Sequence, residues 1–246
     1  MINFLMILSC MKMIFDPTSS VLLVVAYITD LATAYREEIK ELYDLGCRNI
    51  EIDDPQIAFF SYEPMIEQMR SQGKDPEYLL DTAIKAINLC TQGRPEDLCI
   101  GIHFCRGNHK GRSLFNSSYE RIAKERVFER LDVDVFYLEF DNSNNSGDFS
   151  PLRNFPTDKA IVLGLVTSKN GQLESPEEIK SRVFEAATVM SEGHPTRSKE
   201  EALNQLCISP QCGFASTWEG NPVTEEDERK KLSLLIQTAK EIWETS

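Results

Sequence analysis

The chain has 246 residues, which is enough for one domain with a large hydrophobic core. Its formal net charge of −13 argues against nucleic acid and against an anionic membrane surface as partners. No apolar run reaches the roughly 18 to 20 residues that a membrane span needs, and seven cysteines without a regular framework indicate free thiols in a reducing, cytoplasmic compartment.

Residues 1–28 form an atypical N-terminal segment. The run MINFLMILSCMKMIF is apolar and rich in methionine, and the run VLLVVAY at residues 21–27 has the composition of an additional strand. The segment is either an improvised first element or sequence from outside the true coding frame. We therefore predict two parts, this segment and a folded domain at residues 29–246.

Within the domain, amphipathic helices alternate with short apolar strands. Helical periodicity predicts helices at residues 30–46, 76–93, 118–131, 175–190 and 224–243. Nearly continuous apolar runs predict strands at residues 49–53, 98–105, 133–140, 160–166 and 205–209. This alternation is typical of an α/β protein with a parallel sheet covered by helices, and a (β/α)8 barrel with its functional site at the carboxyl ends of the strands fits it.

Two sets of side chains are predicted to face the core. The final helix should turn one apolar face inward, made of Leu232, Leu235, Ile236, Ala239 and Trp243. Four cysteines fall on predicted buried faces and are expected to be core residues: Cys47, Cys90, Cys99 and Cys207.

Polar, metal-binding side chains stand at three of the strand ends. His103 and Cys105 lie two apart on one strand and therefore point to the same side, while Glu139 ends the next strand and Cys212 follows a later one. One imidazole, one carboxylate and two thiols are a four-ligand set for Zn²⁺. The alternative is that each side chain simply packs in the core, since no short Cys-x-x-Cys spacing supports the metal site. The residues alone leave both interpretations open.

Further polar residues follow the His-x-Cys pair. Arg106, Asn108 and Ser113 are expected to orient the loop that leaves this strand. His109 and His194 lie in polar loops and are expected to face solvent.

Five segments occur in a characteristic order: GIHFCRGN, VFYLEFD, IVLGLVTSK, LCISPQCGFAST and EGNP. Together with AYREEIKELYDLGCRNIEIDDP upstream, they resemble the catalytic domain of cobalamin-independent methionine synthase. The similarity is greatest to its short, single-barrel relatives, the methyltetrahydropteroyltriglutamate–homocysteine methyltransferase-like proteins. It extends from about Asp30 to Trp243.

The resemblance implies a (β/α)8 TIM barrel of the methionine synthase/uroporphyrinogen decarboxylase type. The five predicted strands correspond to the later strands of that barrel. The first strands, which supply much of the contact to the substrate carboxylate and to folate, are therefore expected to be lacking. Residues 29–246 are accordingly predicted to be a partial (β/α)8 barrel catalytic domain. Open barrel edges lead us to expect self-association.

The resemblance also implies the chemistry. The family's zinc ligands carry over to His103, Cys105, Glu139 and Cys212, and Asp53 of EIDDP takes the place of the catalytic, substrate-binding aspartate that pairs with the substrate amine. The implied reaction moves a methyl group from 5-methyltetrahydrofolate, as its polyglutamate, to homocysteine and forms methionine. Two alternatives remain: a truncated, catalytically impaired zinc-binding homologue, or a related barrel that alkylates another thiol.

Overall fold

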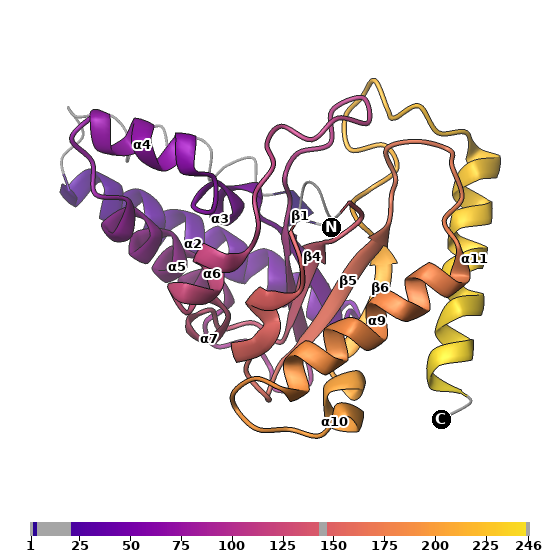
Figure 1. Ribbon diagram of the computed structural model, residues 1–246. Helices are drawn as coiled ribbons and strands as arrows, with labels where there is room; N and C mark the ends of the chain where they lie inside the picture. The colour runs from indigo at the N-terminus through magenta and orange to yellow at the C-terminus, as the bar shows by residue number, and fades with distance from the viewer. Residues whose placement is uncertain (1, 4–20, 143–146, 245–246) are drawn as a thin grey trace.

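A single parallel sheet, whose strand order follows the chain, forms the centre of the computed structural model, which describes residues 2–3, 21–142 and 147–244 (Figure 1). Its strands are β1 (Ile2–Asn3), β2 (Asn49–Asp53), β3 (Cys99–Phe104), β4 (Val135–Glu139), β5 (Ala160–Val166) and β6 (Leu206–Pro210). All five strands predicted in the domain are confirmed. Most of the atypical N-terminal segment lies outside the described residues.

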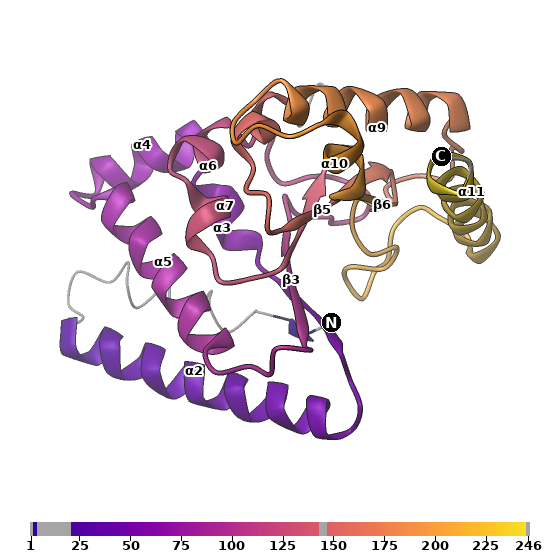
Figure 2. The same ribbon diagram turned by 90° about the horizontal axis from the view of Figure 1, so that it is seen from below.

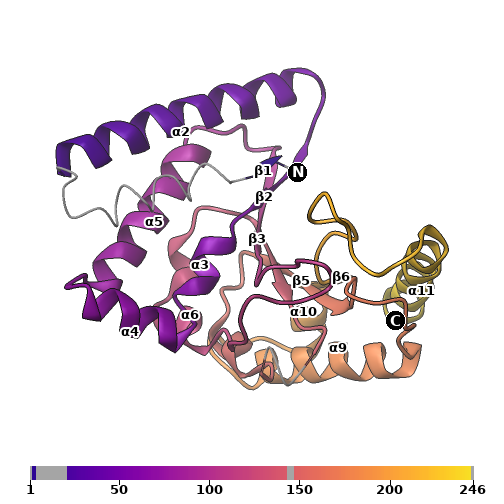
Figure 3. The ribbon, with the colours of Figure 1, turned by 90° about the horizontal axis from the view of Figure 1, so that it is seen from above.

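Helices connect the strands and cover the outer face of the sheet. They are α2 (Val21–Asp44), α3 (Pro55–Phe59), α4 (Glu63–Ser71), α5 (Pro76–Thr91), α6 (Glu120–Lys124), α7 (Val127–Arg130), the 3₁₀ turn η1 (Ser150–Asn154), α9 (Pro176–Ser191), α10 (Lys199–Asn204) and α11 (Glu225–Trp243). Viewed from above, α2, α5, α9 and α11 follow one another around the outside of the strands (Figure 3). The view from below shows α2 and α11 at the two ends of this arc (Figure 2).

The sheet has two open ends in the part of the chain that the structure describes, because β1 pairs only with β2 and β6 only with β5. Cys207 of β6 is consequently exposed, and its predicted core position is wrong. In the register of the sheet it stands in one row with Tyr137 and His103, on the inner face. Cys90 is buried as expected, whereas Cys47 and Cys99 are half-buried.

The run VLLVVAY is helical, so the prediction of an additional strand there is wrong. It forms the first two turns of α2. The buried side of this helix continues at helical spacing through Ile28, Leu31, Tyr35 and Ile39. Propensity for strand is a weak local preference, and the packing of this longer apolar stripe overrides it. The helix also runs across the boundary proposed between residues 28 and 29.

The helix predicted at residues 118–131 is broken into α6 and α7. Arg126 adopts a left-handed backbone conformation, with φ of 56°, and ends the helical path between them. The turn brings Val127 and Phe128 into the core, where both are fully buried.

The inward face of α11 differs from the predicted one. Leu235 is buried, but Leu232 and Ile236 are 40% and 61% exposed. Lys231 is fully buried instead, and its ammonium group binds Glu174 at 2.9 Å. The buried side of α11 consists of Lys231, Leu234, Leu235, Thr238 and Ile242.

Candidate metal centre

The carboxyl ends of three strands, β3, β4 and β6, hold the four side chains that the sequence singled out. His103 lies near the end of β3, Cys105 follows directly after β3, Glu139 is the last residue of β4, and Cys212 comes two residues after β6. Parallel strands end at the same edge of a sheet, so side chains far apart in sequence meet there. One donor atom from each of the four residues lies within 4.8 Å of all the others.

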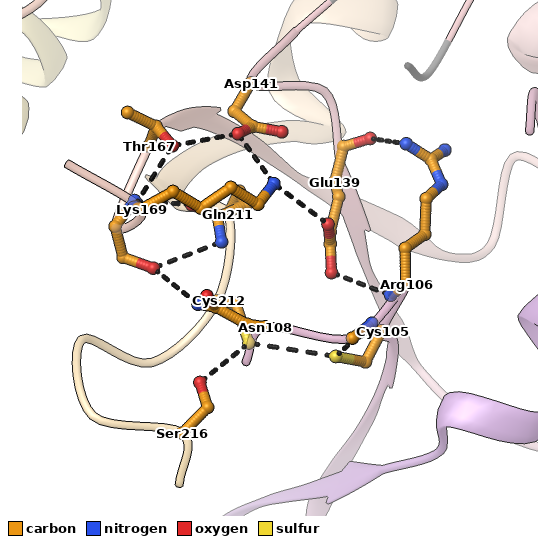
Figure 4. Close-up of polar contacts among 12 residues, drawn as sticks. Cys105, Arg106, Asn108, Glu139, Asp141, Thr167, Lys169, Gln211, Cys212 and Ser216 are labelled. Atoms are coloured by element: carbon orange, nitrogen blue, oxygen red, sulfur yellow. Dashed lines mark hydrogen bonds and ion pairs between the residues drawn. The ribbon is translucent and has the colours of Figure 1, made fainter. Parts of the chain in front are cut away.

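The distances within this group match a tetrahedral metal site. The two sulfurs, Sγ of Cys105 and Sγ of Cys212, are 3.8 Å apart, and Nε2 of His103 is 3.8 Å from Oε1 of Glu139. Two sulfurs that each lie about 2.3 Å from a tetrahedral zinc ion are separated by about 3.8 Å. Figure 4 shows Cys105 and Cys212 turned toward each other, with Glu139 beside them.

Two of the donor atoms have unused bonding capacity. Nε2 of His103 and Oε2 of Glu139 are buried and have no hydrogen-bond partner, and such atoms are costly unless something binds them. Nδ1 of His103 lies 3.3 Å from the carbonyl oxygen of Tyr137. A carbonyl only accepts, so Nδ1 carries a proton and Nε2 is the atom left to bind a cation. The residues therefore fit a zinc ion.

The protein groups also polarise one another. The hydrogen bond from Cys105, supported by His103 and opposed by burial, lowers the pKa of the Cys212 thiol far below its usual value. Burial opposes protonation of His103, but the neighbouring Cys212 thiolate, together with Glu139, raises its pKa to about 9. Burial raises the pKa of Glu139. A cation that binds here competes with protons, and binding would release them.

Asp53 is the fifth residue that the sequence predicted for the site. It ends β2, lies in register with His103, and lines a cavity of about 700 Å³ together with His103, Cys105 and Cys212. Its Oδ1 is buried without a hydrogen-bond partner, and burial raises the pKa of the carboxyl group. Asp53 thus shares one cavity with His103, Cys105 and Cys212, whereas Glu139 belongs to the donor cluster but does not line this cavity.

The neighbouring Asp54 does something different. Its Oδ1 accepts hydrogen bonds from the backbone N–H groups of Gln56, at 2.7 Å, and Ile57, at 3.3 Å, and so caps α3. Full burial raises its pKa to about 6. Asp54 therefore fixes the chain that follows β2, while Asp53 keeps an oxygen available to the cavity.

The loops around the centre are tied together by a buried polar cluster that the sequence did not reveal. Ser168, after β5, receives a hydrogen bond from Asn108 at 3.0 Å and donates one to the carbonyl oxygen of Gly213 at 2.9 Å. Gln211 accepts from the backbone N–H of Ser168 at 2.5 Å. The contacts join the loop after Cys105 to the loop that carries Cys212. Asn108 orients this loop as predicted.

Lys169 is a second residue that sequence reasoning missed. Its Nζ lies 2.9 Å from Oδ2 of Asp141 and 3.7 Å from Oε2 of Glu139 (Figure 4). The available signal was its position three residues after β5, the strand between those that carry Glu139 and Cys212. His109 and His194 are exposed, as expected. Ser113 takes no part in the cluster and lines a separate polar pocket with Lys169.

Comparison with known proteins identifies the class to which this fold and site belong. Residues 24–240 match the family described as cobalamin-independent synthase, catalytic domain, and the chain belongs to this family. The uncharacterized Bacillus subtilis protein YxjH is 43% identical over 218 residues, which are 88% of this chain and 54% of that protein. The 5-methyltetrahydropteroyltriglutamate–homocysteine methyltransferase of the same organism is 24% identical over 211 residues, which are 86% of this chain and 23% of that enzyme.

A solved structure agrees with these sequence relations. A Listeria monocytogenes protein assigned to the vitamin-B12-independent methionine synthases superposes with a TM-score of 0.64 at 33% identity, covering 88% of this chain and 55% of that one. The predicted family and fold class are confirmed: the parallel α/β sheet corresponds to part of a methionine synthase-type barrel. The chain spans about half the length of YxjH and of the Listeria protein. No helix among the described residues is long and apolar enough to cross a bilayer.

Proposed function

We propose that this chain carries a zinc-dependent site for methyl transfer from 5-methyltetrahydrofolate, as its polyglutamate, to homocysteine, with methionine as the product. The observation that carries the proposal is the convergence of the His103, Cys105, Glu139 and Cys212 donor atoms within 4.8 Å at the carboxyl ends of the strands. Membership of the cobalamin-independent synthase family supports the reaction type. The cytoplasm, where free thiols persist, is the proposed compartment.

The four donors are the proposed zinc ligands. Two thiolates and an imidazole favour zinc over magnesium or calcium, which prefer oxygen. Zinc, when bound, lowers the pKa of a thiol that enters its coordination sphere and so provides a thiolate near neutral pH. Glu139 is the hardest of the four donors, and its second oxygen faces Lys169. It is the donor we expect to yield to an incoming sulfur.

Asp53 is the proposed catalytic and substrate-binding carboxylate. Homocysteine carries an ammonium group, and the unpaired Oδ1 of Asp53 lies in the wall of the same cavity as the two thiols. An ammonium–carboxylate hydrogen bond there would hold the amino acid with its sulfur toward the cysteines. Residues 29–246 are the proposed catalytic part of the chain.

A direct test combines metal analysis with a transfer assay. The purified chain is loaded with Zn²⁺, dialysed and analysed for metal, and is then incubated with homocysteine and methyl-labelled donor. We expect about one zinc per chain through the four donors and labelled methionine above the level given by a Cys212→Ser control. A chain that keeps no zinc, or a control that produces as much labelled methionine, would refute the proposal.

The open edge of the sheet at β6 favours a second candidate, a zinc-binding homologue of impaired activity. Cys207 on this strand is exposed, and β6 has no further neighbour among the described residues. Open edges of this kind promote self-association. Zinc binding without methionine formation would support this candidate. Labelled product from a different thiol, offered in the same assay, would indicate a related alkylating barrel.

A further inference from the structure

Arg106, directly after the His-x-Cys pair, is the largest of the fully buried side chains, with 1% of its surface exposed. No carboxylate forms an ion pair with it in the part of the chain that the structure describes. Its Nε and Nη2 atoms also have no hydrogen-bond partner. A guanidinium is a permanent cation, and burying one without a counter-charge is costly. Packing alone therefore does not explain this residue.

The contacts of Arg106 are directed at Glu139. The backbone N–H of Arg106 donates to Oε1 of Glu139 at 2.9 Å, and its guanidinium Nη1 donates to the backbone oxygen of Glu139 at 3.1 Å (Figure 4). Arg106 thus binds both the carboxylate and the main chain of Glu139. The guanidinium itself lies over the ring of Tyr119, with 4.2 Å between its central carbon and the ring centroid.

Tyr119 completes the support. Its hydroxyl accepts a hydrogen bond from the backbone N–H of Glu139 at 2.9 Å and donates one to the carbonyl oxygen of Phe104 at 3.3 Å. The register of β3 and β4 ends where Phe104 faces Leu138. The next residues, Cys105 and Glu139, are therefore held at their separation by a phenol hydroxyl that bridges the two strands, in place of the strand ladder.

Charge gives Arg106 a second role. Two thiolates and one carboxylate bring three negative charges to a divalent cation, which leaves the loaded centre with an excess of one negative charge. Lys169 is the other nearby cation, but Asp141 at 2.9 Å offsets it. Arg106 is then the cation that balances the centre, and electrostatic interactions are strong in such a buried site.

We infer that Arg106 and Tyr119 are positioning residues of the metal centre: together they fix Glu139 against Cys105, and Arg106 offsets the negative charge of the loaded site. Neither residue is a ligand or touches substrate. The inference rests on the proposed zinc site and adds two residues that determine how tightly, and in what geometry, the metal is held.

The test is metal affinity and cobalt spectroscopy on the full chain. Zn²⁺ and Co²⁺ binding are measured by competition with a chromogenic chelator for the parent and for Arg106→Met, Arg106→Lys and Tyr119→Phe. Arg182→Met is the matched control, because its guanidinium also lies over an aromatic ring, that of Phe149 at 5.3 Å, but on α9, which supplies no ligand. Circular dichroism verifies that each variant is folded.

We expect Arg106→Met to lower metal affinity about 10- to 100-fold, the usual effect of losing an outer-shell partner. Arg106→Lys keeps the charge and should recover part of the loss. Tyr119→Phe should weaken binding less and shift the d–d bands of bound Co²⁺, with the thiolate charge-transfer band kept, because both sulfurs stay. Arg182→Met should match the parent.

The outcomes are distinguishable. A folded parent that binds neither metal refutes the proposed zinc site itself. A parent that binds, with Arg106→Met folded and within about twofold of its affinity, overturns the present inference, since about 10-fold or more is expected. If Arg106→Met does not fold, Tyr119→Phe decides, because it removes a single oxygen: parental affinity together with a parental Co²⁺ spectrum would overturn the inference as well.

Discussion

Two neighbouring rows of side chains cross the sheet, one residue apart in each strand. The outer row is almost completely buried under the helices and consists of Ile52, Ile102, Phe136, Ile161 and Leu206. The inner row consists of Asp53, His103, Tyr137, Val162 and Cys207. The outer row is wholly apolar and contains no side chain that could bind a metal or take part in catalysis. The inner row holds unsatisfied polar atoms and an exposed thiol. Stability and function are therefore assigned to opposite faces of the same strands.

The largest expected effect compares adjacent residues of β4. Phe136→Ala removes a fully buried ring from the outer row and should lower the free energy of unfolding by about 3–5 kcal/mol. Tyr137 of the inner row is half-buried, so Tyr137→Ala should cost clearly less, because its ring is already partly hydrated. Urea unfolding of both variants measures the difference. Equal losses would show that the inner face is covered as well as the outer one.

The second effect is a loss of zinc affinity, caused by a substitution that does not alter the outer row. Cys105→Ala should weaken zinc binding by roughly 3 kcal/mol, about a quarter of the binding free energy of a structural zinc site. Cys207→Ala is the matched control, because it removes a thiol from the same face outside the cluster. Chelator competition gives both affinities. A control that loses zinc as strongly as Cys105→Ala would place the metal elsewhere.

The third effect is a pH dependence of stability at Asp54. Burial raises its folded pKa to about 6 from an ordinary value of 3.8, so between these values the folded chain binds more protons than the unfolded one. The free energy of unfolding should therefore fall as the pH rises from about 4 to about 6, by roughly 2–3 kcal/mol from this group. Asp54→Asn keeps the helix cap and should have a flatter profile. Identical profiles from pH 4 to 7 would contradict the raised pKa.

The smallest effect separates substrate binding from metal binding. Asp53→Asn should weaken homocysteine binding about tenfold, near 1.4 kcal/mol, because the ammonium group loses a charged partner. Its zinc content should stay at the parental level, since Asp53 is outside the four-donor cluster. Calorimetry measures the affinity for homocysteine, and elemental analysis measures the zinc content. Unchanged homocysteine affinity would remove Asp53 from the substrate site.

The sequence predicted the strand ends better than the helices. The strands could be located because their apolar runs are short and end on polar residues, and His103, Cys105 and Glu139 follow from these ends. The inward face of α11 was missed because a buried Lys231 depends on Glu174, a partner 57 residues away. Arg126 gave no local signal of a left-handed turn, since glycine and asparagine are the usual residues there.

The polar supports of the site were harder still to predict. Ser168 is an ordinary loop serine until the fold brings Asn108, 60 residues away in sequence, to its side chain. Arg106 was expected only to orient a loop, and its burial beside Tyr119 depends on how β3 and β4 pair. Local patterns identify donor residues, whereas the contacts that hold them are set by tertiary structure.

X-ray absorption at the zinc edge tests the central claim most directly. The chain loaded with one equivalent of Zn²⁺ should show two sulfur neighbours at about 2.3 Å and two nitrogen or oxygen neighbours at about 2.0–2.2 Å, contributed by Cys105, Cys212, His103 and Glu139. The sulfur count should fall to one in Cys212→Ala. A first shell without sulfur, or one that keeps two sulfurs in that variant, would contradict the assignment of the metal centre to these strand ends.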